Sequence, residues 1–461
     1  MGCLINQESN YAGDFGAAFR SSAIFYKPKN VKTILSFSNY WEFKNSLSVG
    51  LLVTFRDMNG GLVARREVDF ADGNVLNIEV QEVEEGSVEV EAFSCKNLRI
   101  PYAAIMAVYE TENSISMVHS YGRNHSLIEL EDGKGITQAR ESCWTLRASE
   151  NISNLAIFHN GHVALEEQEG KFSVVREDGT EETAKFVIPA LKPFETFVFD
   201  AEQIFPQLVE YLDDGIGWGT LHFESQSSFT RLLIVWKNSV TGEVQVTHSN
   251  FDYSSHETNT VDSAKPAYMV LPTVYGEIPD VLVYPKFSSG TYLANGEDEF
   301  SSGLIMQDNP SVLSFSRTDG ELPARIVTAV TGACSYDVSI PYECSLGVVH
   351  EKRPPKRFHW FLVSSVLPSV IHITAYDKIY PSTEAVNLVV RLYSDSTKEI
   401  DEVLLSYESL ASVPSEISVD EIFNLSGINN YGCISIFSHY GGFFVFSSLR
   451  KKNVVTLEHS F

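Results

Sequence analysis

The sequence predicts an all-β protein built from four tandem antiparallel β-sandwich units, with short helical turns at the corners. Short alternations of apolar and polar residues fill the chain, separated by turn pairs that include five Asp-Gly dipeptides. These segments also recur in the same order along the chain, which is typical of repeat proteins. With 461 residues, 44% of them hydrophobic, the chain can bury several cores.

Each unit is expected to open with an apolar strand that ends in asparagine. The two best copies are "KNVKTILSFSN" at 29–39 and "ENISNLAIFHN" at 150–160. A hairpin follows, and it is written three times, at 51–70, 172–188 and 388–405. In two of these copies Asn59-Gly60 and Asp178-Gly179 supply residues that tolerate the positive φ angles of tight hairpin turns.

A short helical turn is predicted after the hairpin. The segments "FDAEQIFPQL" (199–208) and "VDEIFNL" (419–425) match, and each begins with an aspartate, Asp200 or Asp420, that we expect to cap the turn. The next strand is similar in the two copies, "GTLHFES" and "GCISIFS".

The last element of a unit ends in His-Ser, in "MVHSYG", "VTHSNF" and "LEHSF". Strand side chains alternate with period two, so His119, His248 and His459 should lie on the same side as Met117, Val246 and Leu457. We therefore expect each histidine to point toward the core of its own sandwich and to bond a loop backbone, as a structural motif of the unit.

The third unit shows a different similarity. "IPYECSLGVVHE" (340–351) matches "IPYAAIMAVYE" (100–110), which pairs the third unit with the first and suggests a duplicated pair. The predicted boundaries are a tail at 1–20 and units at 21–135, 136–262, 263–355 and 356–461. Six cysteines are scattered without CxxC spacing. Buried thiols are the simplest interpretation, although Cys334 and Cys344 are close enough in sequence to pair.

The second and fourth units resemble the immunoglobulin-like β-sandwich repeats of bacterial secreted and surface proteins. The resemblance follows from "IPALKPFETFVFDAEQIFP" (188–206), then "GWGTLHFES" (217–225) and "RLLIVW" (231–236). It is clearest over 145–250, although the proline that usually follows the first strand is replaced by Gly161. The resemblance implies sandwich architecture and an adhesive or structural role.

A formal charge of −26 disfavours binding to nucleic acid or to anionic lipid. The most apolar stretch, 359–376, contains Pro368 and two histidines, so we expect two strands there and no membrane insertion. No basic and apolar leader opens the sequence. These features lead us to expect a cytoplasmic protein or one exported by a non-classical route.

No nucleotide-binding or nucleophile motif is present, and no cofactor is predicted. A divalent metal remains open, because His248, Asp252 and His256 follow at steps of four. That spacing brings ligands together only on a helix, whereas His248 continues a strand alternation. The segment His159, His162 and Glu166 is another loosely spaced set, for which a polar loop is the simpler interpretation.

Two functions remain. The first is a non-catalytic structural or binding protein with a protein or carbohydrate partner, in which Tyr253 and Tyr431 could stack on a ligand. The second is a metal-dependent enzyme with a site formed by histidines at strand ends between units. Buried Trp144 and Trp236 are expected in either case, because both belong to apolar strands.

Overall fold

The computed structural model confirms the all-β prediction. It describes residues 19–460 except for 71–72, 99–104, 120, 133–139, 214, 226–227, 229–230, 253–259, 262–265, 285–289, 302, 324–325, 333–339, 348–355 and 378–379. Of the described residues 56% lie in strands and 7% in helical turns, and every strand pair in a sheet is antiparallel. No helix among the described residues is long and apolar enough to cross a membrane.

The strands fall into four successive segments. The first contains β1 (Phe19–Lys27), β2 (Lys32–Ser38), β3 (Gly50–Asp57), β4 (Leu62–Val68), β5 (Val75–Glu79), β6 (Gly86–Ser94), β7 (Ile105–Glu110) and β8 (Ile115–His119). The second contains β9 (Arg140–Arg147), β10 (Ile152–His159), β11 (Gln168–Val175), β12 (Glu181–Ile188), β13 (Thr196–Asp200), β14 (Ile216–His222), β15 (Leu233–Asn238), β16 (Val244–His248) and the edge strand β17 (Asn250–Asp252).

The third and fourth segments continue the series. The third contains β19 (Ala267–Val270), β20 (Asp280–Val283), β21 (Tyr292–Ala294), β22 (Asp298–Phe300), β23 (Leu304–Met306), β24 (Val312–Arg317), β26 (Val327–Thr331) and β27 (Glu343–Gly347), with β18 (Thr260–Val261) paired to β25 (Leu322–Pro323) beside it. The fourth contains β28 (Phe358–Ser364), β29 (Ser369–Ala375), β30 (Val386–Tyr393), β31 (Ile400–Tyr407), β32 (Glu416–Ser418), β33 (Tyr431–Ser438), β34 (Phe443–Lys451) and β35 (Val454–His459).

Each segment forms two sheets with the same strand order. Counting the eight main strands within a segment, one sheet has the order 1-6-3-4 and the other 5-2-7-8. We call the two sheets of a segment a sheet pair. The sheet that contains the eighth strand is its inner sheet, and the other is its outer sheet. One connectivity is thus used four times, although the third segment has much shorter strands than the others.

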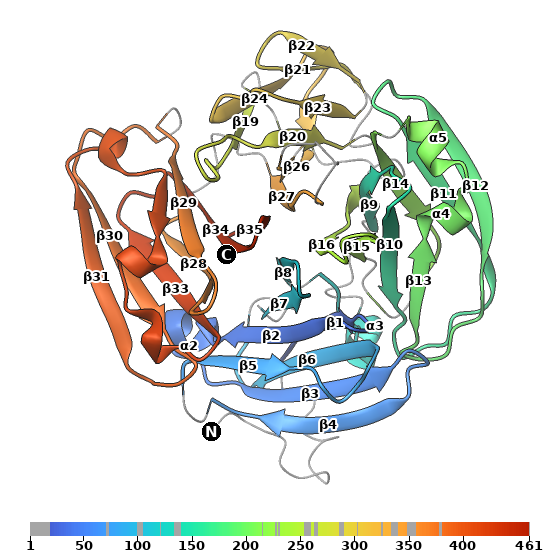
Figure 1. Ribbon diagram of the computed structural model, residues 1–461, viewed down its shortest axis with the longest axis horizontal. Coiled ribbons are helices and arrows are strands. Elements are labelled where there is room, and N and C mark those ends of the chain that lie inside the picture. Colours follow the sequence, from blue (N-terminus) through green and yellow to red (C-terminus); the bar gives the residue numbers. More distant parts are fainter. Residues whose placement is uncertain are drawn as a thin grey trace.

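The four sheet pairs stand around a common centre, as Figure 1 shows. The eighth strands β8, β16, β27 and β35 meet there, and each packs against the eighth strands of its two neighbours. Hydrogen bonds tie these strands together: Val246 N–H donates to Ser116 Oγ at 2.9 Å, and Met117 N–H donates to Thr456 Oγ1 at 3.0 Å. The chain therefore closes a ring in which the fourth sheet pair contacts the first.

The inner sheets are buried on both faces. In the second pair, Ile234 and Trp236 of β15 pack into the core with Trp144 of the outer sheet. Leu233 and Val235 of the same strand point the other way and pack with the first sheet pair. This arrangement explains why Trp144 and Trp236 are 1% and 0% exposed, which confirms their predicted burial.

The predicted hairpins are present, but only glycine has a positive φ in their turns. Gly60 has φ +80° and Gly179 has φ +83°, whereas neither Asn59 nor Asp178 lies in that region. In the second hairpin Gly179 N–H donates to the Arg176 carbonyl, and Arg176 N–H donates to the Thr180 carbonyl. This bonding is typical of a type I turn followed by a glycine bulge.

Short helices occupy the corners: α2 (Tyr40–Asn45), α3 (Leu127–Asp132), α4 (Ala201–Ile204), α5 (Leu208–Leu212), and the 3₁₀ turns η2 (Leu410–Ser412), η3 (Val419–Glu421) and η4 (Leu425–Gly427). Asp200 caps α4, because its carboxylate accepts from Gln203 N–H at 3.1 Å. The expectation for Asp420 is wrong: it lies inside η3, and Ser418 occupies the N-cap position.

Three further expectations change. The segments at 29–39 and 150–160 form second strands, because β1 and β9 precede them. The two "IPY" segments are not equivalent, since the residues after the first form a seventh strand, β7, and those after the second an eighth, β27. The apparent match between the first and third units therefore does not align their folds. Cys344 is a free thiol, and Cys334 lies outside the described residues.

Candidate functional site

Three strand ends bring three histidines together at the centre of the ring. His119 ends β8, His248 ends β16 and His459 ends β35. The His119 ring centroid lies 4.6 Å from that of His248 and 5.1 Å from that of His459, and both contacts are edge to face. Side chains separated by more than a hundred residues thus form one cluster, which we call the axial cluster.

The His-Ser motif orients two of these rings. His248 Nδ1 lies 2.8 Å from the Ser249 carbonyl, and His459 Nδ1 lies 3.2 Å from the Ser460 carbonyl. A carbonyl only accepts, so each Nδ1 carries the proton and each Nε2 keeps its lone pair. The repeated dipeptide therefore selects the same tautomer in both copies.

Glu458 completes the axial cluster. Its Oε1 lies 3.3 Å from His119 Nδ1 and 3.6 Å from His459 Nε2. The Cys344 thiol of β27 approaches the same oxygen at 4.0 Å. A carboxylate with a side-chain exposure of 8% thus contacts residues of the first, third and fourth sheet pairs.

Burial governs the protonation of the axial cluster. Burial lowers the pKa of His459 to about 4, and burial with the Arg231 charge holds the pKa of His248 well below its usual value. For Glu458, burial alone would raise the pKa, but His119 and His459 together hold it below the usual range. Around neutral pH the axial cluster therefore holds neutral His248 and His459 beside an ionised carboxylate.

The predicted direction of the three histidines is wrong. They do share a face with the apolar residues of their strands, but that face is not the core of their own sheet pair. Met117 packs with residues of the fourth pair, Val246 with the first and Leu457 with the third. Because an inner sheet is covered on both faces, strand alternation leads toward the ring centre as well as toward the core.

The other predicted residues are placed as follows. Asp252 ends β17, while His256 and Tyr253 lie outside the described residues, so the set His248, Asp252 and His256 stays a prediction. Tyr431 is fully buried, and its hydroxyl donates to Glu110 at 2.6 Å. Since neither face of its ring is exposed, Tyr431 cannot stack on a ligand from solvent, and that expectation is corrected.

His159 is also held in place by neighbours. Its Nε2 lies 2.9 Å from the Tyr121 hydroxyl, and its Nδ1 lies 2.9 Å from Thr196 Oγ1. Burial lowers its pKa to about 3. With both nitrogens hydrogen-bonded, His159 joins the first and second sheet pairs as a structural residue.

Glu458 is the residue that sequence reasoning missed. The position before the histidine holds Val118 in the first copy and Thr247 in the second, so an acid there departs from the repeat. A charged residue inside an apolar strand alternation is costly to bury unless it is paired. The acidic residue at this position of the repeat was therefore the sequence feature that could have identified Glu458.

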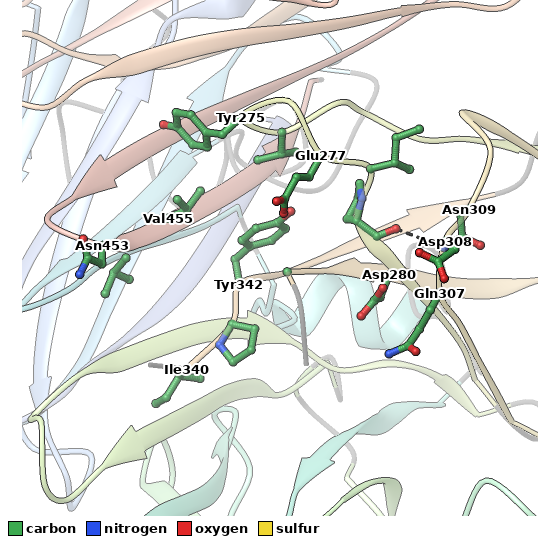
Figure 2. A pocket seen from close by; sticks show the side chains of 16 residues that line it. Tyr275, Glu277, Asp280, Gln307, Asp308, Asn309, Ile340, Tyr342, Asn453 and Val455 are labelled. Carbon is green, nitrogen blue, oxygen red and sulfur yellow. Dashed lines mark hydrogen bonds between the residues drawn. The ribbon is translucent and has the colours of Figure 1, made fainter. Parts of the chain in front are cut away.

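A second feature is an open pocket of about 1040 Å³ between the third and fourth sheet pairs. Figure 2 shows Tyr342 in the middle of the pocket lining, with Glu277 beside its ring. Asp280 and Asp308 lie toward one side, and Asn453 lies toward the other. Two tyrosines, three carboxylates and three amides are among the lining residues: Tyr275, Tyr342, Glu277, Asp280, Asp308, Gln307, Asn309 and Asn453.

The pocket lining combines rigid and exposed groups. Tyr342 is only 9% exposed and packs in the core of the third pair. Tyr275 is 37% exposed, and the N–H groups of Tyr275 and Gly276 contact the Glu416 carboxylate of the fourth pair. Asn309 is 8% exposed, and its Oδ1 has no hydrogen-bond partner among the described residues. The pocket thus offers an aromatic surface with polar groups around it.

No known protein family matches the chain, and no curated protein matches it. Among solved structures, a β-glucuronidase of Bacteroides uniformis is 13% identical over 55% of this chain, with a TM-score of 0.12, and the chain spans 27% of that enzyme. The viral chemokine binding protein R17 of rodent gammaherpesvirus Peru is 10% identical, with a TM-score of 0.14. The match covers 75% of this chain and 88% of the viral protein. A tetra-tandem repeat from the extending region of a large adhesion protein is 9% identical, with a TM-score of 0.08. The match covers 96% of this chain and 98% of the repeat structure. Likeness at this level carries no argument about function.

Proposed function

We propose that the protein is a non-catalytic binding protein made of four immunoglobulin-like β-sandwich modules, and that it binds neutral carbohydrate in the pocket between the third and fourth modules. The repeated strand order supports the modular part of the proposal. The single observation that carries the binding part is the pocket lining, which joins tyrosine rings to carboxylate and amide groups.

The lining matches what sugar rings require. The C–H faces of a sugar pack on aromatic rings, and its hydroxyls donate to carboxylates and exchange hydrogen bonds with amides. Tyr275 is 37% exposed and its ring lies 5.2 Å from the Arg450 guanidinium, whereas Asp308 and Asn453 supply polar groups on opposite sides of the pocket. A few convergent polar groups in a preformed concave site are typical of small-ligand recognition.

The negative charge of the pocket lining limits the class of sugar that the pocket is expected to bind. The described lining residues include three acids and neither lysine nor arginine, and the whole chain carries −26. Anionic sugars would be repelled, because an acidic concave surface focuses a negative potential. Neutral glycans meet no such barrier.

An array of neutral and anionic glycans, probed with the purified protein, tests the proposal. We expect binding to neutral glycans, with a loss of at least tenfold in affinity for Tyr275→Ala and for Asp308→Asn. Asp308 has φ +51°, a conformation that asparagine also tolerates, so the second substitution should preserve the fold. The matched control is Asp298→Asn, an exposed aspartate of β22 outside the pocket, which should bind as the unaltered protein does.

Binding of only anionic glycans, or no binding at all, would overturn the carbohydrate proposal. Equal losses in Asp298→Asn and Asp308→Asn would also contradict it, because they would show that the pocket is not the binding site. A lysine-rich peptide serves as the competing probe. If it binds and no glycan does, the acidic pocket serves a protein partner.

A metal-dependent enzyme is the second candidate, and one specific observation favours it. His119 and His459, at strand ends of different sheet pairs, lie close enough to share an ion with Glu458. None of these three residues belongs to the set suggested by the sequence, which was His248, Asp252 and His256. Assay of metal-loaded protein against a panel of ester, amide and glycoside substrates tests this candidate, and a lack of turnover would eliminate it.

A further inference from the structure

We propose that His119, His459 and Glu458 form a binding site for a divalent transition metal ion of the zinc class, which clasps the first module to the fourth. Their ligand atoms all lie within 4.8 Å of one another. Two imidazoles and one carboxylate form a ligand set that zinc accepts, with a further position left for water. This proposal is independent of the carbohydrate pocket.

The distances agree with a shared ion. Zinc binds imidazole nitrogen and carboxylate oxygen at about 2.0–2.1 Å, so two ligands of a tetrahedral ion lie roughly 3.3–3.4 Å apart. The Glu458 oxygen lies 3.3 Å from His119 Nδ1 and 3.6 Å from His459 Nε2. The ligand atoms of His119 and His459 lie within 4.8 Å of each other, so binding would draw the two rings closer together around the ion.

The surroundings of His459 match those of a metal ligand. Imidazoles that bind metal usually donate their other N–H to a carbonyl or carboxylate, which fixes the ring and the tautomer. His459 Nδ1 lies 3.2 Å from the Ser460 carbonyl, and its Nε2 faces the Glu458 carboxylate at 3.6 Å. The strand end is itself held, since Ser460 Oγ lies 2.7 Å from His359 Nδ1 and Lys356 Nζ donates to the Ser460 carbonyl.

A second pair of histidine and glutamate lies at a similar distance but lacks the other features of a metal site. His372 Nδ1 lies 3.2 Å from Glu416 Oε1, a separation similar to those in the axial cluster. However, His372 Nδ1 also lies 2.7 Å from the Thr273 carbonyl, and Nε2 lies 2.8 Å from Ser448 Oγ. Both nitrogens are thus engaged, and no third metal-binding side chain joins this pair in the part of the chain that the structure describes. His372 is therefore the matched control for the experiment.

The position of the site gives the ion a specific role. His119 belongs to β8 of the first module, whereas Glu458 and His459 belong to β35 of the last. No peptide linker joins these two modules directly, and the hydrogen bond from Met117 to Thr456 spans 339 residues of sequence. An ion between them adds a link at the place where the ring closes.

The test uses full-length protein without a histidine tag. We expect calorimetric titration of chelator-treated protein with Zn²⁺ to show one tight site per chain. Glu458→Gln and His459→Gln should each weaken it by at least tenfold, as loss of a ligand does. His372→Gln should leave it unchanged. No tight site in the unaltered protein, or equal weakening in His372→Gln, would overturn the proposal.

A second measurement needs no variant, and so it does not depend on their folding. X-ray absorption of the zinc-loaded, unaltered protein should show a first shell of two imidazoles with oxygen ligands. A shell without imidazole, or one that contains sulfur from Cys344, would refute the assigned ligands. Zn²⁺ should also raise the melting temperature of the unaltered protein, because the ion binds only the closed ring.

Discussion

Two joints of the ring are built in different ways. Between the second and third sheet pairs, Arg147 of β9 and Glu343 of β27 form an ion pair of 3.2 Å in which neither side chain is exposed to solvent. The Tyr284 hydroxyl donates to the same carboxylate at 2.7 Å, and the Arg147 guanidinium lies 4.7 Å from the Trp236 ring centroid. We call this the charged joint.

Between the first and fourth sheet pairs, stacked aromatic rings lie beside polar contacts, such as that of Lys451 Nζ with the Glu110 carboxylate at 3.5 Å. Phe43 stacks on Tyr393 with ring centroids 4.0 Å apart, and Tyr40 stacks on Trp360 at 5.9 Å. A cluster of apolar side chains from both pairs surrounds the hydrogen-bonded Tyr431. We call this the closing joint.

The difference between the two joints predicts how much stability each loses when a side chain is removed. A buried ion pair gains little over an apolar substitute, yet removal of one partner strands a charge in a dry interior. Burial already raises the pKa of Glu343 against the opposing effect of Arg147. Aromatic contacts instead lose energy in proportion to the surface removed. The charged joint should therefore be specific and fragile, and the closing joint tolerant.

Arg147→Ala should have the largest effect. It leaves Glu343 buried without its cation, and we expect a loss of about 3–5 kcal/mol in the free energy of unfolding. Urea denaturation measures this value. The paired replacement of Arg147 by Met and Glu343 by Leu should recover most of it, and a double variant as unstable as the single one would contradict the charged-joint argument.

Trp236→Ala comes next, at roughly 3 kcal/mol. The ring is fully buried in the core of the second pair, and its Nε1 donates to the Thr145 carbonyl at 3.2 Å. Because Arg147 packs on this ring, the losses from Trp236→Ala and Arg147→Ala should not add. A double-mutant cycle by urea denaturation checks the coupling, and strict additivity would show that the contact has no energetic role.

Phe43→Ala should cost less, about 1–2 kcal/mol, because its side chain is only partly buried before truncation. The same denaturation assay applies. Leu62→Ala is the control, since Leu62 is 60% exposed and should change stability little. If Phe43→Ala destabilised the protein as much as Arg147→Ala, the closing joint would not be the tolerant one.

His159→Gln should have the smallest effect at neutral pH and alter the pH dependence instead. The pKa of His159 is about 3 in the folded protein against an ordinary 6.5, so the unfolded chain takes up the proton first as pH falls. The contribution of His159 to the free energy of unfolding is therefore fully present above pH 6.5. It declines as the pH falls toward 3, by up to about 1.4 kcal/mol per pH unit. The variant should show a correspondingly shallower decline in urea denaturation between pH 6 and pH 4. Parallel curves would show that His159 does not titrate in this way.

Much of the fold could be predicted from local patterns. The hairpins at Gly60 and Gly179, the cap at Asp200 and the burial of Trp236 each depend on a few neighbouring residues. The third segment could not be aligned, because strands of three or four residues such as β21 carry too few alternations.

The candidate site depended on information that one strand does not hold. The sequence placed His119, His248 and His459 at equivalent strand ends, but not the ring that brings those ends together. In β16 all five residues are buried, so alternation could not tell the core face from the ring face. Glu458 was hidden for the same reason, although its contrast with Val118 and Thr247 marked it as unusual.

Closure of the ring also bears on how the chain folds. The contact from Val246 to Ser116 spans 130 residues, and that from Met117 to Thr456 spans 339. Loop-closure entropy rises by only about 0.6 kcal/mol per doubling of length, so the longer closure costs less than 1 kcal/mol more at equilibrium. In kinetics such contacts are slow, because each sheet pair must form before its edges can meet. We therefore expect the joint between the first and fourth sheet pairs, whose contacts are the more distant in sequence, to close last.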